Sequence, residues 1–138
     1  MQQVAYMKRT QLRIDNVTRL LAALTDPIRL RLVRLLLREE LCVCELVDAL
    51  GMPQYKVSRH LGTLRRAQLV TVRRRGRWMH YRLGESTGEA GFARRLIEFL
   101  DRELLELADV KRDDRRLAER LRLRRSGECV VGITRSCR

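Results

Sequence analysis

Two cysteines separated by a single residue, Cys42 and Cys44, have the spacing in this 138-residue chain that would allow them to bind one ion together. Thiolates are soft ligands that select soft ions, and trivalent arsenic and antimony favour three thiolates arranged as a pyramid. Residues i and i+2 point to different sides of a regular helix. Sharing one ion therefore requires that the pair lies in the extended segment before a helix, or that binding distorts the first helical turn.

A three-thiolate site needs one more ligand, and the remaining cysteines are Cys129 and Cys137. Either thiol could fold back onto the pair, from the same subunit or from a partner. Alternatively, water or another small donor completes a two-thiolate site, or the C-terminal thiols form a separate site. Simpler interpretations are that Cys42 and Cys44 pack as small apolar residues and that the last two cysteines take no part.

The formal net charge of +13, from 30 Lys and Arg against 17 Asp and Glu, predicts a polyanionic partner, with nucleic acid as the first choice. The window 49–84 contains no Asp or Glu, although surfaces of mixed sign are the norm. Its basic residues are Lys56, Arg59, Arg65, Arg66, Arg73, Arg74, Arg75, Arg77 and Arg82. We expect a phosphate-facing surface there, and the alternative is an ordinary solvated face.

Membrane association and catalysis are both disfavoured. No stretch approaches the ~18 apolar residues of a membrane span, and residues 1–10 lack the apolar core of a signal peptide. We therefore expect a cytoplasmic protein, where cysteines serve as ligands or redox groups more often than as structural disulfides. A thiol enzyme is disfavoured because no Cys-x-x-Cys pair, catalytic triad or phosphate-binding glycine loop is present, so we expect no catalytic residue and no organic cofactor.

The elements that must position these residues can be predicted from apolar spacing. Four helices are expected first: 17–24 capped by Asn16, 27–38 capped by Asp26, 44–50 ended by Gly51, and 54–67. The period then changes to alternation, which predicts a hairpin with strands 69–73 and 78–83. A long helix over 92–110 follows, and 111–125 is expected to be a loose helix or disordered.

This order of elements predicts a mainly α fold with a small antiparallel β-hairpin, a winged helix-turn-helix dimerised through its N- and C-terminal helices. Residues 1–110 would form the DNA-binding and dimerisation domain, and 111–138 a basic, cysteine-containing tail. A homodimer is expected because one small winged domain would not easily bury the apolar stripe of the long helix alone; the alternative is packing within one chain. The predicted dimer residues are Leu20, Leu24, Phe92, Leu96, Phe99, Leu100, Leu104 and Leu107.

The helix over 54–67 is the expected recognition helix, and its N-terminal part is the region that usually meets base edges. The turn of the hairpin is expected to contact phosphate or the minor groove. The predicted contacts with double-stranded operator DNA are Gln54, Tyr55, Lys56, Ser58, Arg59, Thr63, Arg74, Arg75 and Arg77.

Four stretches of the sequence resemble the ArsR/SmtB family of metal-responsive repressors. Residues 25–30, 40–46, 57–61 and 76–83 read Thr-Asp-Pro-Ile-Arg-Leu, Glu-Leu-Cys-Val-Cys-Glu-Leu, Val-Ser-Arg-His-Leu and Gly-Arg-Trp-Met-His-Tyr-Arg-Leu. The cysteine-containing stretch is similar to the arsenical-sensing branch, which implies a dimeric winged-helix repressor released from its operator by a metalloid. That branch often has another cysteine three residues after Cys44, where this chain has Val47.

The resemblance implies As(III) or Sb(III) as inducer, bound by thiolates drawn from Cys42, Cys44, Cys129 and Cys137. The family's zinc sensors use histidine and carboxylate pairs on the long C-terminal helix, which here has no histidine, and His60 and His80 lie in the DNA-binding unit. Two other regulatory readings remain: a redox switch at Cys42 and Cys44, and a sensor of other thiophilic metals such as cadmium, lead or zinc.

Overall fold

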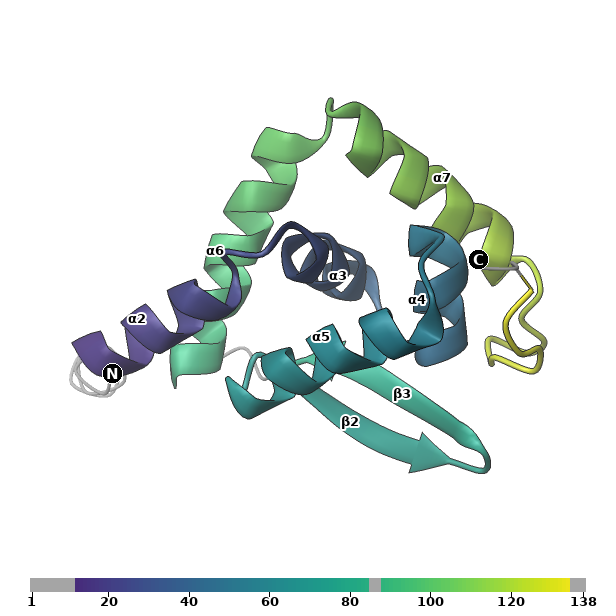
Figure 1. Ribbon diagram of the computed structural model, residues 1–138, viewed down its shortest axis with the longest axis horizontal. Coiled ribbons are helices and arrows are strands. Elements are labelled where there is room, and N and C mark those ends of the chain that lie inside the picture. The colour runs from purple at the N-terminus through teal and green to yellow at the C-terminus, as the bar shows by residue number, and fades with distance from the viewer. Residues whose placement is uncertain (1–11, 85–87, 135–138) are drawn as a thin grey trace.

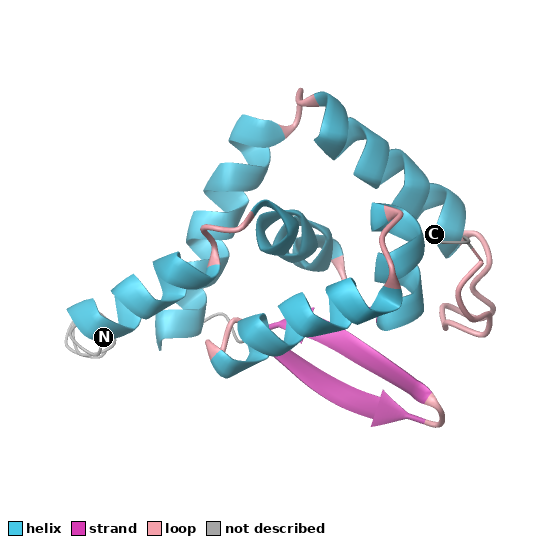
Figure 2. Ribbon diagram, in the orientation of Figure 1, coloured by secondary structure: helices cyan, strands magenta, loops and turns pink. Residues whose placement is uncertain are grey.

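The computed structural model describes residues 12–84 and 88–134, so the prediction for Cys137 lies outside the described residues. The chain is mainly helical, with one small sheet whose strands lie between helices in the sequence (Figures 1 and 2). The elements are α2 (Ile14–Ala23), α3 (Pro27–Arg38), β1 (Leu41–Cys42), α4 (Val43–Leu50), α5 (Gln54–Arg66), β2 (Val70–Arg75), β3 (Trp78–Leu83), α6 (Gly88–Leu104) and α7 (Ala108–Leu121).

Helix α3 is central, and Figure 1 shows it nearly end-on with α4, α5, α6 and α7 around it. It begins as predicted, because the side chain of Asp26 accepts hydrogen bonds from the backbone N–H groups of Ile28 (2.8 Å) and Arg29 (3.1 Å). Pro27 occupies the first helical position, where its missing N–H has no cost. The broad apolar surface is buried on several sides, and its fully buried residues include Leu32, Val33, Leu35 and Leu36.

Helices α4 and α5 form the predicted helix-turn-helix. Gly51 ends α4 with a φ of 65°, a left-handed conformation that glycine adopts without steric cost. Val57, Leu61 and Leu64 of α5 are fully buried, as their spacing predicted. The outer face of α5 is thereby fixed toward solvent.

The sheet has the order β1-β3-β2, and both pairs are antiparallel. Strands β2 and β3 form the predicted wing, in which Arg75 pairs with Trp78 across a turn made by Gly76 and Arg77. Strand β1 adds two residues at the other side of β3, where Cys42 lies opposite His80. This short strand was not predicted, and it connects the wing to the start of α4.

The predicted long helix over 92–110 is wrong. Helix α6 ends at Leu104, and a separate helix α7 begins at Ala108. Helix α7 is ordered and packs against α4, with Leu117 buried in the main core, so the expectation of a loose or disordered segment is also wrong. The division at residue 110 stays a prediction.

Buried ion pairs fix the positions of α6 and α7 relative to α3. Arg31 donates to Asp113 of α7 at 2.7 Å and 2.8 Å. Arg34, fully buried, lies 2.8 Å from Asp101 of α6 and 3.1 Å from Asp114 of α7. Charges inside a protein are tolerated when each has a partner, so these arginines specify where the two helices lie.

Helix α2 starts at Ile14, so Asn16 lies inside the helix and the expectation that it caps one is wrong. Among the described residues, no helix has the length and apolar character needed to cross a membrane.

The cap at Asp26 gives a test of this fold. We expect Asp26→Ala to lower the free energy of unfolding by about 1 kcal/mol, because two backbone N–H groups of α3 lose their acceptor. Urea unfolding followed by circular dichroism measures the change. Asp26→Asn keeps an acceptor oxygen and should lose much less, and equal losses in both variants would contradict the role of the cap.

Candidate functional site

Three of the four cysteines come together in a buried cluster next to Trp78. The Sγ atom of Cys129 lies 2.8 Å from that of Cys42 and 3.2 Å from that of Cys44. Cys42 and Cys44 are themselves joined by a disulfide. The exposed fractions of the three residues are 0%, 2% and 5%, so the cluster is closed to solvent.

The local backbone explains how residues two apart point to one place. Cys42 belongs to β1 and precedes α4 in an extended conformation, with φ −81° and ψ 160°. Cys44 is the second residue of the helix. The pair therefore straddles the strand-to-helix junction. Cys42 lies in the extended segment before the helix, as the first of the two expected arrangements requires, but Cys44 lies in the first helical turn.

Cys129 reaches the pair because the segment after α7 is anchored to α4. Arg120 of α7, almost completely buried, forms an ion pair with Asp48 of α4, with Nε 2.8 Å from Oδ2. The Arg120 guanidinium also donates to the carbonyl oxygens of Val131 and Gly132. Asp48 in turn accepts from the Thr134 hydroxyl at 2.7 Å. The segment 129–134 is thus held from both sides of the cysteine cluster.

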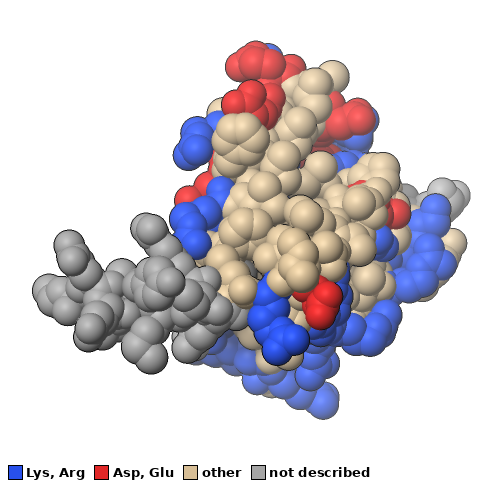
Figure 3. All heavy atoms as spheres, turned by 90° about the vertical axis from the view of Figure 1, so that its left-hand side faces the viewer, with Lys and Arg blue, Asp and Glu red and all other residues tan. Residues whose placement is uncertain are grey.

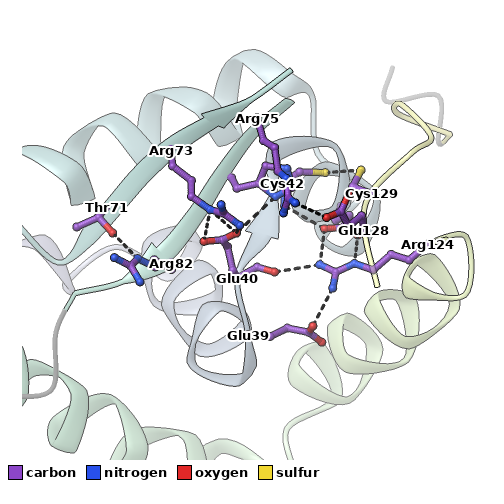
Figure 4. Close-up of polar contacts among 12 residues, drawn as sticks. Glu39, Glu40, Cys42, Thr71, Arg73, Arg75, Arg82, Arg124, Glu128 and Cys129 are labelled. Atoms are coloured by element: carbon purple, nitrogen blue, oxygen red, sulfur yellow. Dashed lines mark hydrogen bonds and ion pairs between the residues drawn. The ribbon is translucent and has the colours of Figure 1, made fainter. Parts of the chain in front are cut away.

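A second buried pair joins the same surfaces closer to the sulfurs. Glu45 of α4 accepts from Arg124 at 2.6 Å and 2.9 Å, and from the backbone N–H of Cys42 at 3.0 Å. Arg124 also reaches Glu39 and the carbonyl oxygen of Glu40, as Figure 4 shows. The carboxylate that fixes the backbone of Cys42 is therefore neutralised by an arginine that follows α7.

This environment favours the neutral thiol of Cys129. Burial raises the pKa of Cys129, and the nearby Glu45 carboxylate raises it further, while Arg120 and Arg124 act in the opposite direction. Cys129 is consequently protonated at neutral pH. A ligand that binds this sulfur must displace a proton.

The donor set fits a soft, three-coordinate ion. Among the described residues, Cys42, Cys44 and Cys129 are the group whose potential ligand atoms all lie within 4.8 Å of one another. No histidine belongs to that group. His80 lies opposite Cys42 in the sheet, but its Nδ1 is 3.8 Å from Glu40. Four-ligand zinc coordination is therefore not preformed in this part of the chain.

The predicted DNA-contact residues lie on one edge of the molecule. On α5, Gln54, Tyr55, Ser58 and Arg59 are exposed, and Lys56 and Thr63 are half-buried. Arg74, Arg75 and Arg77 are exposed at the tip of the wing. Figure 3 shows that Lys and Arg gather along the lower edge, where Figure 1 has α5 and the hairpin, while Asp and Glu gather at the top.

The predicted dimer residues divide into three groups by their exposure. Leu20 and Leu24 are buried in the core of the chain itself. Phe99 and Leu107 are 50% and 53% exposed, and Ile14 of α2 is 75% exposed. Phe92, Leu96, Leu100 and Leu104 are half-buried. Helices α2 and α6 contact each other, and Figure 3 shows on that side a continuous area of residues other than Lys, Arg, Asp and Glu.

Sequence reasoning missed the residues that hold Cys129, namely Asp48, Glu45, Arg120 and Arg124. A usable signal was present, since Val110, Leu117 and Leu121 recur at helical spacing on α7 and Arg120 shares that face. The density of charge in 111–125 concealed this apolar stripe.

Comparison with known proteins gives one family. The model described as bacterial regulatory protein, arsR family, matches residues 26–72. The arsenic resistance transcriptional regulator ArsR1 of Pseudomonas putida is 52% identical over 61 residues, which are 44% of this chain and 48% of that protein. The match thus spans about half of that relative's length.

Two solved structures are similar over most of their own length. HlyU from Vibrio cholerae aligns with a TM-score of 0.61 and 32% identity, covering 67% of this chain and 95% of that one. A homodimeric winged helix-turn-helix domain from Mycobacterium bovis aligns with a TM-score of 0.56 and 30% identity, covering 67% and 84%.

The anchoring of segment 129–134 can be tested through Thr134. We expect Thr134→Val to speed modification of Cys129 by a thiol reagent about fivefold, because one hydrogen bond to buried Asp48, worth ~1 kcal/mol, is lost. Mass spectrometry of the Cys129 peptide, in a Cys42→Ser/Cys44→Ser background, measures the rate. Thr18→Val, the same change on α2, should leave it unaltered; an unaltered rate in Thr134→Val would refute the anchoring.

Proposed function

The chain belongs to the ArsR/SmtB family of transcriptional regulators, and on that premise we propose that it is a metalloid-responsive repressor. It binds operator DNA as a homodimer and releases it when trivalent arsenic or antimony binds Cys42, Cys44 and Cys129. The observation that carries the proposal is the approach of Cys129 to within 3.2 Å of both other sulfurs in a closed cluster.

The DNA-binding half of the proposal is supported by shape and charge. Helix α5 presents Tyr55, 67% exposed, together with Ser58 and Arg59 on its outer face. The wing extends beside it with exposed arginines at the tip. A helix that enters the major groove, with a wing against the backbone, uses both features.

The dimer is supported by the apolar face over α2 and α6. Exposed Phe99, Leu107 and Ile14 would be covered by a second copy of the chain, which fits the contact between these helices. A two-fold dimer presents two recognition helices to a palindromic operator.

The charge balance of the cluster favours arsenite over divalent cations. In the reduced protein, As(OH)₃ and three thiols give As(SR)₃ and three waters, a neutral product. A divalent cation and the same thiols give an anionic complex and three protons. An unpaired anion is costly in a closed site, and Glu45 and Asp48 already occupy the neighbouring arginines Arg124 and Arg120.

Binding would reach the DNA-binding unit through the junction of β1 and α4. Cys42 is paired with β3 of the wing, and Cys44 is in the first helix of the helix-turn-helix. Drawing both sulfurs and Cys129 onto one ion would couple these elements to the C-terminal segment. The inducer then shifts the equilibrium toward the conformation in which this cluster is closed.

A second candidate function is a thiol redox switch, and the disulfide between Cys42 and Cys44 favours it. Peroxide would oxidise the two thiols to this disulfide, giving two waters. The two functions differ in their use of Cys129, which the disulfide does not need.

Serine substitution separates these functions. We expect Cys129→Ser to weaken arsenite binding by at least about 100-fold, because only two thiolates remain, and to abolish release of a promoter-DNA fragment by arsenite. Gel shift and the sulfur-to-arsenic absorption measure both effects. Cys137→Ser is the matched control and should respond normally. A Cys129→Ser protein that still answers arsenite would contradict the site; a protein answering only peroxide would identify the redox switch.

The pH dependence tests the charge argument. Because burial raises the pKa of Cys129, a bound cation must displace its proton, so cadmium affinity should rise about tenfold per pH unit per proton released as pH increases from 6 to 8. Arsenite replaces protons and hydroxide together as water, so its affinity should change less than about threefold. Competition titrations under reducing conditions measure both, and parallel profiles would argue against a neutral arsenic complex.

A further inference from the structure

Two wing arginines predicted to face DNA are occupied by carboxylates. Arg73 of β2 makes a bidentate contact with Glu40, with Nη2 2.6 Å from Oε1 and Nε 3.0 Å from Oε2. Arg75, closer to the tip, lies 2.5 Å from Glu128. Figure 4 shows both arginines turned toward these carboxylates and toward the side of the cluster of Cys42 and Cys129. A guanidinium held in this way must exchange its carboxylate for a phosphate before it can contact DNA.

Both carboxylates are carried by the backbone segments that carry the sulfurs. Glu40 precedes Cys42 by two residues, and Glu128 is the immediate neighbour of Cys129. A tight turn sets the direction of Glu128, because the backbones of Arg125 and Glu128 exchange two hydrogen bonds of 3.0 Å. Glu128 therefore lies between this turn and the buried Cys129, its neighbour in the chain.

The two pairs differ in how they can respond. Glu40 lies between the central helix α3 and strand β1, so the backbone around it is fixed by both elements. Glu128 belongs to the segment after α7, and it contacts the wing in a structure in which Cys129 lies in the cluster. The Arg75–Glu128 pair is half-exposed, with side chains 52% and 47% accessible. Such a pair is weak by itself, and DNA phosphates compete with it effectively.

We infer that Glu128 is a latch that removes Arg75 from DNA when the three-sulfur cluster closes. The inference rests on the proposed function. A metalloid bound to Cys42, Cys44 and Cys129 fixes Glu128 beside Arg75, so the carboxylate competes with phosphate at a high local concentration. Without the metalloid the segment is held only by its other contacts, and phosphate displaces Glu128. The inducer thus acts on the wing by charge competition as well as through α4.

Neutralising the latch tests this role. We expect arsenite-loaded Glu128→Gln to bind a labelled mixed-sequence duplex at least about fivefold more tightly than the arsenite-loaded native chain. Its log affinity against log salt should be steeper by about 1, because one phosphate contact is regained. Fluorescence anisotropy at several salt concentrations gives both values. Glu103→Gln removes the same charge from an exposed position on α6 and should match the native chain.

The partner of the latch provides the second arm. In an Arg75→Gln background, Glu128→Gln should change neither affinity nor slope, since its target is gone. Equal affinity and slope for loaded Glu128→Gln and the native chain would overturn the latch. Sulfur-to-arsenic absorption is recorded on the same samples. Absence of this absorption would defeat the proposed function, whereas its presence together with equal affinity and slope would overturn the latch alone.

Discussion

The docking of α7 on α4 is the constraint on which the rest of the site depends. Two arginines of the C-terminal half, Arg120 and Arg124, are paired with Asp48 and Glu45 of α4. A buried charge without its partner is strongly unfavourable, so these pairs tie the two helices to one relative position. Only in that position does the chain after α7 pass beside the β1–α4 junction. The position of the third sulfur therefore depends on ion pairs between α4 and the C-terminal part of the chain.

Two arginines of the basic edge are paired with carboxylates from other parts of the chain. The window 49–84 has no carboxylate of its own, so any neutralisation of its arginines comes from elsewhere in the chain. In the structure it comes from Glu40, two residues before Cys42, and from Glu128, directly before Cys129. Arginines of the basic edge thus have partner carboxylates from other segments, and the proposed release of DNA would depend on whether these pairs are formed.

Local signals in the sequence predicted much of the fold. The cap at Asp26, the left-handed Gly51 and the alternation over 78–83 each depend on neighbouring residues, and each was confirmed. The break after Leu104 was missed because the apolar stripe of α6 continues in register to Leu107 and Val110. What ends the helix is long-range, namely the ion pairs that draw α7 back across α3.

The candidate site, like the fold, was predictable from the sequence only where the signal is local. Cys42 and Cys44 could be recognised from their spacing, and Cys129 was one of two candidates for the third ligand. Choosing between those candidates needed the position of α7, which no local pattern contains. The residues that support Cys129 were hidden because buried arginines cannot be distinguished from solvated ones by sequence alone.

All three sulfurs of the cluster come from one polypeptide, so each subunit of the proposed dimer would bind inducer independently of dimer assembly. A site shared across a two-fold axis can fill only in an assembled pair, and its occupancy then follows the monomer–dimer balance. Here each copy carries a self-contained receptor, so a pair can exist with none, one or both loaded. The dependence of DNA release on inducer concentration would accordingly show how many inducer-bound subunits are needed for the dimer to dissociate from DNA.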